Sequence, residues 1–385
     1  MISAYNITDV KSLSRLETAK TLKKEGFIGA DQPLIDLEQE SVLYHPGWVM
    51  RVLLFIVGLV AISGLLGLWV VLFEDLLDQA WEFFLIGSGV LGLVLHEMVL
   101  VRGLKHYKSG LTEVSLYNFI SLIGMGMAGL LDHYAAAAAL AIAVVCAAAS
   151  LRYRDGLLAA AALLALEAAL FNMLFDAGGA AQVFIPFASM GLFGLVYALA
   201  QYLDKRDGLM DWQPLIDVME AISMGLVYLS VNYLVVRELS VSMLNLDIQP
   251  GEDIALAAVF YGLTILLPLV FLVHGLFRRN RISLWVGMGC AAASVYTFYM
   301  YFWVGYGEIT LTVSGAAVLL LAVYALNRLK TPVKGVTRQL LITANLDVMT
   351  IEGIVISQTA GGLSSGDQPL FKGGDFGGGG ASGQY

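Results

Sequence analysis

Residues 134–175 read YAAAAALAIAVVCAAASLRYRDGLLAAAALLALEAALFNMLF. Two apolar segments of this stretch, residues 134–151 and 156–175, are each long enough to cross about 30 Å of hydrocarbon as a helix. A short basic turn that contains Arg152 and Arg154 separates them. The pattern predicts two antiparallel membrane-spanning helices, and their smooth, alanine-rich surfaces favour a place inside a helix bundle.

The same pattern continues on both sides of this pair. Of the whole chain, 58% is hydrophobic and 14% is charged, whereas about a quarter of a soluble domain is charged. The runs are continuous and do not alternate, so helices must satisfy the backbone hydrogen bonds in lipid. The sequence therefore predicts an all-α polytopic membrane protein with a ten-helix bundle, built from residues 52–73, 81–101, 111–131, 134–151, 156–175, 181–203, 214–236, 253–277, 282–304 and 308–327.

The basic residues set the expected orientation of these spans. Cytoplasmic loops carry an excess of Lys and Arg, and with an inside N-terminus every Lys and Arg except Arg237 falls on the inner side. Ten spans then place both termini in the cytoplasm. The expected domains are a cytosolic helix pair (1–49), the transmembrane domain (50–329), a cytosolic strand pair (330–360) and a Gly-rich tail (361–385).

Both ends of the chain resemble segments of known membrane proteins. Residues 16–28, LETAKTLKKEGFI, resemble the N-terminal segment of an uncharacterised family of bacterial multi-span membrane proteins, a domain of unknown function. Residues 376–383, FGGGGASG, resemble the glycine-rich tails of TPM-domain membrane proteins, although the chain lacks the TPM domain itself. By composition alone, residues 361–385 are typical of a flexible linker. The resemblances imply instead a bacterial inner-membrane protein whose tail docks on a partner through Phe376, Gly377, Gly378, Gly379, Gly380 and Tyr385.

Glu167 is the clearest candidate for chemistry inside the membrane. It lies at the middle of its span, where a charge is costly, and an acid at that depth is a functional-site hypothesis. Asn172 follows on the same span. In span eight, Pro268 cannot donate a hydrogen bond to Thr264 and leaves that carbonyl free. The expected transport or coupling site is thus Glu167, Asn172, Thr264 and Pro268, and the alternatives are a neutral acid bonded to a neighbouring helix and a simple kink.

Other polar and small residues have structural interpretations. We expect His96 and Glu97, and Asp217 and Glu220, to be interfacial anchors near the ends of their spans. Glycines in spans two and three permit close helix packing: Gly87, Gly89, Gly92, Gly124, Gly126 and Gly129.

No enzyme is predicted, since the chain has no HExxH, GxSxG or Walker motif and no cysteine nucleophile with a histidine partner. Cys146 and Cys290 lie inside spans, where a thiol behaves as a small apolar side chain. We therefore expect no catalytic residue, no cofactor and no metal, and no nucleic-acid partner.

Two classes of function agree with this sequence. One is a transporter-like inner-membrane protein, proton- or cation-coupled, that uses Glu167 and the Pro268 break. The other is a membrane scaffold, or a subunit of an envelope complex, that assembles through the N-terminal helices and the Gly-rich tail. The expected partners are the lipid bilayer and further copies of the chain or other membrane proteins.

Overall fold

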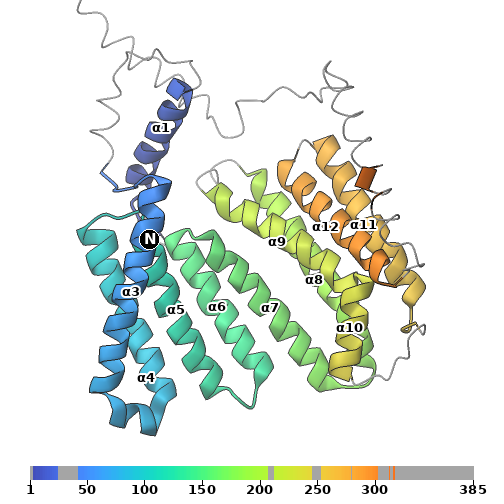
Figure 1. Ribbon diagram of the computed structural model, residues 1–385, viewed down its shortest axis with the longest axis horizontal. Helices are drawn as coiled ribbons and strands as arrows, with labels where there is room; N and C mark the ends of the chain where they lie inside the picture. The colour runs from blue at the N-terminus through green and yellow to red at the C-terminus, as the bar shows by residue number, and fades with distance from the viewer. Residues whose placement is uncertain are drawn as a thin grey trace, which may run out of the picture. The chain divides into compact units, whose positions relative to one another are not determined.

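The computed structural model describes residues 3–24, 42–206, 212–244, 253–278 and 280–301, with the isolated residues 312, 315 and 316 (Figure 1). The chain divides into two compact units. The first, called the helical unit below, is formed by Met1–Lys11 and Val42–Gln339, and the second by Ser12–Ser41 and Leu340–Tyr385.

The N-terminal helix of the predicted pair is α1 (Ile7–Lys24). Apolar residues on one face of this helix are buried, with Leu13, Leu16, Ala19 and Leu22 all less than a tenth exposed. The second helix of the pair, the strand pair and the Gly-rich tail with its docking residues lie outside the described residues.

Within the described residues, nine helices are long and apolar enough to cross a membrane. They correspond to the first nine predicted spans, and the tenth, residues 308–327, lies almost wholly outside the described part. The helices are α3 (Trp48–Leu72), α4 (Glu74–Leu95) with the π-helix η1 (His96–Gly103), α5 (Leu111–Leu130), α6 (Ala135–Tyr153), α7 (Gly156–Ala177), α8 (Ala180–Asp204), α9 (Gln213–Val231), α11 (Ala257–Arg278) and α12 (Arg281–Tyr301).

Large apolar side chains cover the outside of these helices. Leu195, Phe277 and Trp285 are 72%, 83% and 73% exposed. A soluble monomer rarely exposes apolar patches beyond a few hundred Å², whereas lipid tails solvate such side chains without cost. The surface agrees with a multi-pass membrane protein.

Two helices organise the packing of the helical unit. Helix α5 packs against α3, α4 and α6, and α9 packs against α7, α8, α11 and α12 (Figure 1). Among the nine spans, α5 and α9 also have the largest buried share. The alanine-rich spans, now α6 and α7, pack closely against each other and lie within the bundle between the α5 and α9 groups, which they connect (Figure 1).

The close contact of α4 and α5 depends on glycine, as the sequence predicts for four of the six positions. A methyl group on Gly89, Gly92, Gly126 or Gly129 would meet an atom of the other helix at 2.6 Å or less. Gly87 and Gly124 have room for a side chain. The small residues therefore let these two backbones approach closely. Such close packing stabilises helix pairs in membranes, where lipid provides no hydrophobic driving force between helices.

The seventh predicted span, residues 214–236, is not one helix. Helix α9 ends at Val231, Asn232 has an extended backbone with φ −66° and ψ 126°, and α10 (Tyr233–Leu244) begins at the next residue. The predicted outer loop from Arg237 to Asp253 is therefore helical as far as Leu244. This break places α10 beside the cavity described next.

Candidate functional site

Glu167 lies about half-way along α7, which puts its side chain about 15 Å from either end of the helix at 1.5 Å per residue. Ser189 of α8 donates a hydrogen bond from Oγ to Glu167 Oε1 at 2.8 Å. The second carboxyl oxygen, Oε2, is buried and has no hydrogen-bond partner among the described residues. The carboxyl group at the middle of this span thus has one oxygen that accepts a hydrogen bond, and one, called open below, that has no partner among the described residues.

A pocket of about 220 Å³ lies beside this carboxyl group, between α7, α8, α9 and α10. Glu167 is the sole ionisable side chain among the described residues that line it. Phe171 and Phe175 follow Glu167 on α7 at spacings of one and two turns and also line the pocket. The pocket therefore extends from Glu167 toward the C-terminal end of α7.

The turn from α7 to α8 positions two walls of this pocket. Gly178 and Gly179 have φ values of +66° and +55°, a backbone conformation that favours glycine. Beyond the turn, Gln182 Nε2 donates to the Phe175 carbonyl at 3.1 Å. Pro186 lies inside α8 and lines the pocket; because proline has no N–H, the backbone loses one hydrogen bond here.

The other two walls come from the broken helix. Leu226, Leu229 and Ser230 of α9 line the pocket, and on α10 so do several residues that follow Asn232, Val236 among them. An unbroken helix would continue along the α9 axis, so the change of direction at Asn232 decides where the α10 side chains lie.

Asn232 itself belongs to a buried polar cluster with α11 and α12. Its Nδ2 donates to Tyr228 Oη at 2.7 Å and to Thr297 Oγ1 at 3.1 Å. The N–H of Tyr233, the first residue of α10, donates to Thr264 Oγ1 at 3.0 Å. Side chains of the neighbouring helices thus replace backbone hydrogen bonds that the break removes.

Thr264 of α11 belongs to this cluster, Pro268 follows it on the same helix, and neither lines the Glu167 pocket. Pro268 has no N–H for the Thr264 carbonyl, as the sequence predicts, and Ser294 Oγ donates to that carbonyl at 2.6 Å. The freed carbonyl at depth is therefore satisfied by α12.

The predicted four-residue site is not one site. Asn172 Nδ2 donates to the Ala168 carbonyl of its own helix at 2.7 Å and does not line the pocket. Of the four, only Glu167 lines the pocket. Five residues separate Glu167 from Asn172, which turns the two side chains about 140° apart on a helix of 3.6 residues per turn.

The predicted interfacial anchors also have specific partners. Glu220 is 3% exposed, and its Oε1 accepts hydrogen bonds from Asn280 Nδ2 at 2.6 Å and Ser283 Oγ at 3.1 Å. It is a buried contact between α9 and the start of α12, so its prediction as an anchor is wrong. Glu97 accepts hydrogen bonds from Arg152, the shortest 2.6 Å, and forms an ion pair with Arg102.

Sequence reasoning missed two residues that build the site. Ser189 holds Glu167, and no sequence signal links two residues on different helices. Asn232 did have a signal, because a side-chain amide inside an apolar run must find partners across helices. A search for ionisable residues alone passes over it.

We compared the chain with models of protein families, with curated proteins and with solved structures, and none of the three comparisons gave a match.

Proposed function

We propose that this protein is a membrane transporter whose substrate site is the pocket beside Glu167, and that its transport is coupled to protonation of the Glu167 carboxyl group. The observation that carries the proposal is the open Oε2 atom of Glu167, which is buried next to a cavity and lacks a hydrogen-bond partner among the described residues.

The energetics of burial support a functional role for this acid. A charged residue at the centre of a membrane helix costs about 2.5–3.5 kcal/mol on insertion scales, so such residues persist where they have a function. An acid with a structural role has its oxygens satisfied, as Glu220 has for Oε1 through two donors. Glu167 receives one hydrogen bond, from Ser189, and its other oxygen is available to a proton or a ligand.

The helix break beside the pocket supports the same proposal. Substrate sites of secondary transporters commonly lie near the bilayer midplane, next to discontinuous helices. Here the wall formed by α10 begins directly after the break at Asn232. A change of direction at one extended residue would move this wall relative to Glu167, which is the motion that alternating access requires.

Dicyclohexylcarbodiimide, an apolar reagent that reacts with protonated carboxyl groups in membranes, tests whether Glu167 exchanges protons with the pocket. We expect the purified protein to acquire one adduct at Glu167, seen by mass spectrometry of peptides, and the yield to fall as pH rises. The variant Glu167→Gln should lose the adduct. Glu220→Gln is the matched control and should keep it, because it changes a buried acid outside the pocket. A protein that reacts elsewhere but never at Glu167 would contradict the proposal.

A second experiment separates transport from the scaffold function, which depends on the N-terminal helices and on a tail that lies outside the described residues. In a strain that lacks the gene, Glu167→Gln should fail to restore the phenotype, whereas a chain without residues 373–385 should restore it. The opposite result would favour a scaffold that docks through its tail.

A further inference from the structure

We infer that the pocket beside Glu167 takes an organic cation, a molecule with one ammonium-type charge attached to an apolar body about as large as an aromatic ring. The inference rests on the proposed function for the identity of the site and adds the chemical class of the substrate. It follows from the charge, the aromatic rings and the hydrogen-bond donors of the pocket walls.

The residues that line the pocket can carry negative charge only. Glu167 is its sole ionisable side chain among the described residues, and the lining includes no Lys, Arg or His. Ser189 occupies Oε1 and leaves Oε2 open. An ionised Glu167 therefore attracts a cation and repels an anion, and the attraction is stronger than in water because the apolar lining lowers the local dielectric constant.

The hydroxyl donors of the walls are already used within the protein, and Gln182, the side-chain amide that lines the pocket, donates one of its two N–H groups to the Phe175 carbonyl. The hydroxyl of Ser189 bonds to Glu167 at 2.8 Å, that of Ser230 to the Val227 carbonyl at 2.9 Å, and that of Ser240 to the Val236 carbonyl at 2.7 Å. Anions and sugars need donors from their site, because their oxygens must be satisfied when they leave water. Apart from the second N–H of Gln182, the side-chain polar atoms that this pocket offers to a ligand are acceptors.

Two aromatic rings are placed to contact the charged group or the ring of such a ligand. Phe171 and Phe175 stack with their centroids 5.9 Å apart and their planes at 12°, and both line the pocket. The faces of aromatic rings attract cations within about 6 Å, and aromatic side chains recognise quaternary ammonium groups in this way. Most other lining residues are aliphatic, which suits an apolar body.

The position of the pocket gives the ligand a route from the bilayer. Leu229, Leu239 and Met243 line it and are 46%, 39% and 46% exposed on the apolar outer surface. A cation with an apolar body concentrates in the bilayer and reaches these residues from the lipid side. On binding, the Glu167 carboxylic acid releases its proton, and it takes up a proton again when the cation leaves, so one proton exchanges for one cation.

Protection from dicyclohexylcarbodiimide tests the class of ligand on the full-length protein in a neutral detergent. Phenyltrimethylammonium is the probe, and tert-butylbenzene has the same shape without the charge. We expect saturating phenyltrimethylammonium to slow formation of the Glu167 adduct at least several-fold, and tert-butylbenzene and benzenesulfonate to leave its rate unchanged. Equilibrium dialysis of labelled phenyltrimethylammonium should show saturable binding that Glu167→Gln abolishes.

A pair of phenylalanine variants adds a readout that leaves the carboxyl group in place. Phe171→Ala should retain the adduct but require a higher concentration of phenyltrimethylammonium for protection. Phe277→Ala should behave as the unchanged protein, because Phe277 is 83% exposed and does not line the pocket.

Each other outcome overturns a defined part of the argument. Equal suppression of the Glu167 adduct by phenyltrimethylammonium and tert-butylbenzene, or suppression by neither, would refute the organic-cation class. Protection by benzenesulfonate would do the same. The proposal that Glu167 marks the site would remain. Absence of an adduct at Glu167 would refute the proposed function and this inference together.

Discussion

Glu167 and Glu220 show how the surroundings of a buried acid separate two roles. Glu220 Oε1 accepts two hydrogen bonds, from Asn280 and Ser283, and joins α9 to the start of α12. Glu167 accepts one hydrogen bond, from Ser189, and its Oε2 atom faces no donor among the described residues. A carboxyl oxygen that two donors hold stabilises a contact between helices, whereas the unbonded Oε2 of Glu167 is available to a proton or a cation.

His106 lies in the loop between η1 and α5, where burial lowers the pKa of its imidazole below 6.5. In the unfolded chain the ring binds a proton near its ordinary pKa, so between these two pKa values the unfolded state holds more protons and stability rises with pH. We expect the melting temperature to fall as pH decreases from 7 to 5.

The variant His106→Gln should show a shallower decrease, measured by thermal unfolding in detergent. Equal slopes for the variant and the unchanged protein would mean that His106 titrates alike in both states. Its Nδ1 lies 3.0 Å from Ser109 Oγ, and glutamine retains a polar group for this contact.

For single residues, the sequence predicts the position along a membrane span. It does not predict which side chains of other helices a residue contacts. The lengths of the apolar runs place Glu167 at the middle of its span, and the structure agrees. Ser189, which bonds to Glu167, lies on another helix. Asn172 is close to Glu167 in sequence, but the turn of the helix directs its side chain away from the pocket. A list of polar residues at one depth is therefore not a site.

Among the elements, the α4–α5 pair gives the clearest test of packing. A methyl group at Gly126 would lie 2.6 Å from the Glu82 carbonyl oxygen, a backbone atom, whereas the nearest contact at Gly124 is 3.8 Å. We expect Gly126→Ala to destabilise the protein by about 1–3 kcal/mol, as overpacking usually does, and Gly124→Ala to be nearly neutral. Unfolding monitored by circular dichroism in detergent measures both; equal effects would show that α4 and α5 do not approach as described.

The break between α9 and α10 depends on Asn232, which is 2% exposed and bonds to Tyr228 and Thr297. Asn232→Ala leaves buried polar atoms without partners, and we expect it to destabilise the protein by about 1–3 kcal/mol. Asn172→Ala is the matched control, since that amide bonds only within its own helix turn to Ala168. If both variants melt at the same temperature, the Asn232 cluster does not hold the break in place.

The sequence alone could not locate this break. Residues 214–236 form one apolar run without Gly or Pro at the point of the break, and periodicity predicts a single helix there. The extended backbone at Asn232 is stable because side chains of α11 and α12 receive its polar groups. Tertiary contacts of this kind override a local pattern, whereas the bounds of the other described spans followed from apolar length.

For the whole molecule, α9 connects two polar regions with different properties. The Glu167 pocket is lined by Leu226, Leu229 and Ser230 of α9. Tyr228 of α9 and Asn232, directly after this helix, bond instead to Ser294 and Thr297 of α12. The pocket has an open acid oxygen, and the cluster at Asn232 is neutral and densely bonded. A movement at the break would change both regions together, which provides a physical link between ligand binding and helix rearrangement.

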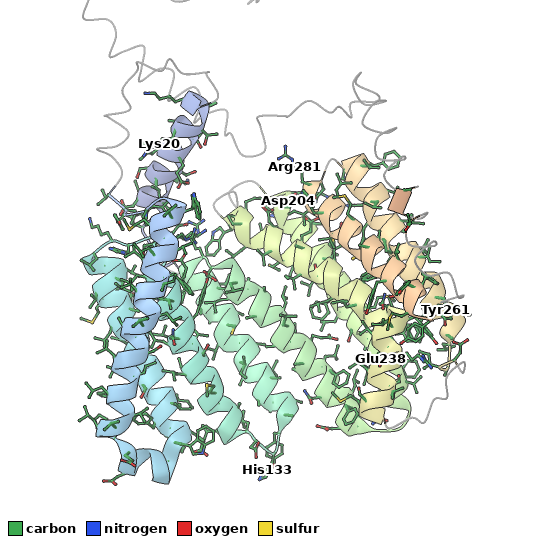
Figure 2. The ribbon with its side chains drawn as sticks, viewed as in Figure 1. Lys20, His133, Asp204, Glu238, Tyr261 and Arg281 are labelled. Atoms are coloured by element: carbon green, nitrogen blue, oxygen red, sulfur yellow. The ribbon has the colours of Figure 1, made fainter. Side chains whose placement is uncertain are left out.

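Several hydrogen bonds and ring contacts join the basic loops at one end of the helical unit. Arg152 in the last turn of α6 bonds to Glu97 of η1, and Arg154 lies over the Trp212 ring before α9 at 5.0 Å. Figure 2 shows Asp204 and Arg281 at one end of the helices and His133 at the other. If the basic end is cytoplasmic, His133 lies outside and the pocket extends from Glu167 toward the outer surface.

Cysteine labelling tests this orientation in a background where Cys146 and Cys290, both buried, are replaced by alanine. His133 and Lys205 are both exposed. Lys205 directly follows Asp204, which Figure 2 shows at the other end of the helices from His133. A membrane-impermeant maleimide should label His133→Cys in intact spheroplasts and label Lys205→Cys only after the membrane is opened. The reverse pattern would invert the protein and direct the pocket toward the cytoplasm, and labelling of both positions from outside would show that the helices between them do not separate two compartments.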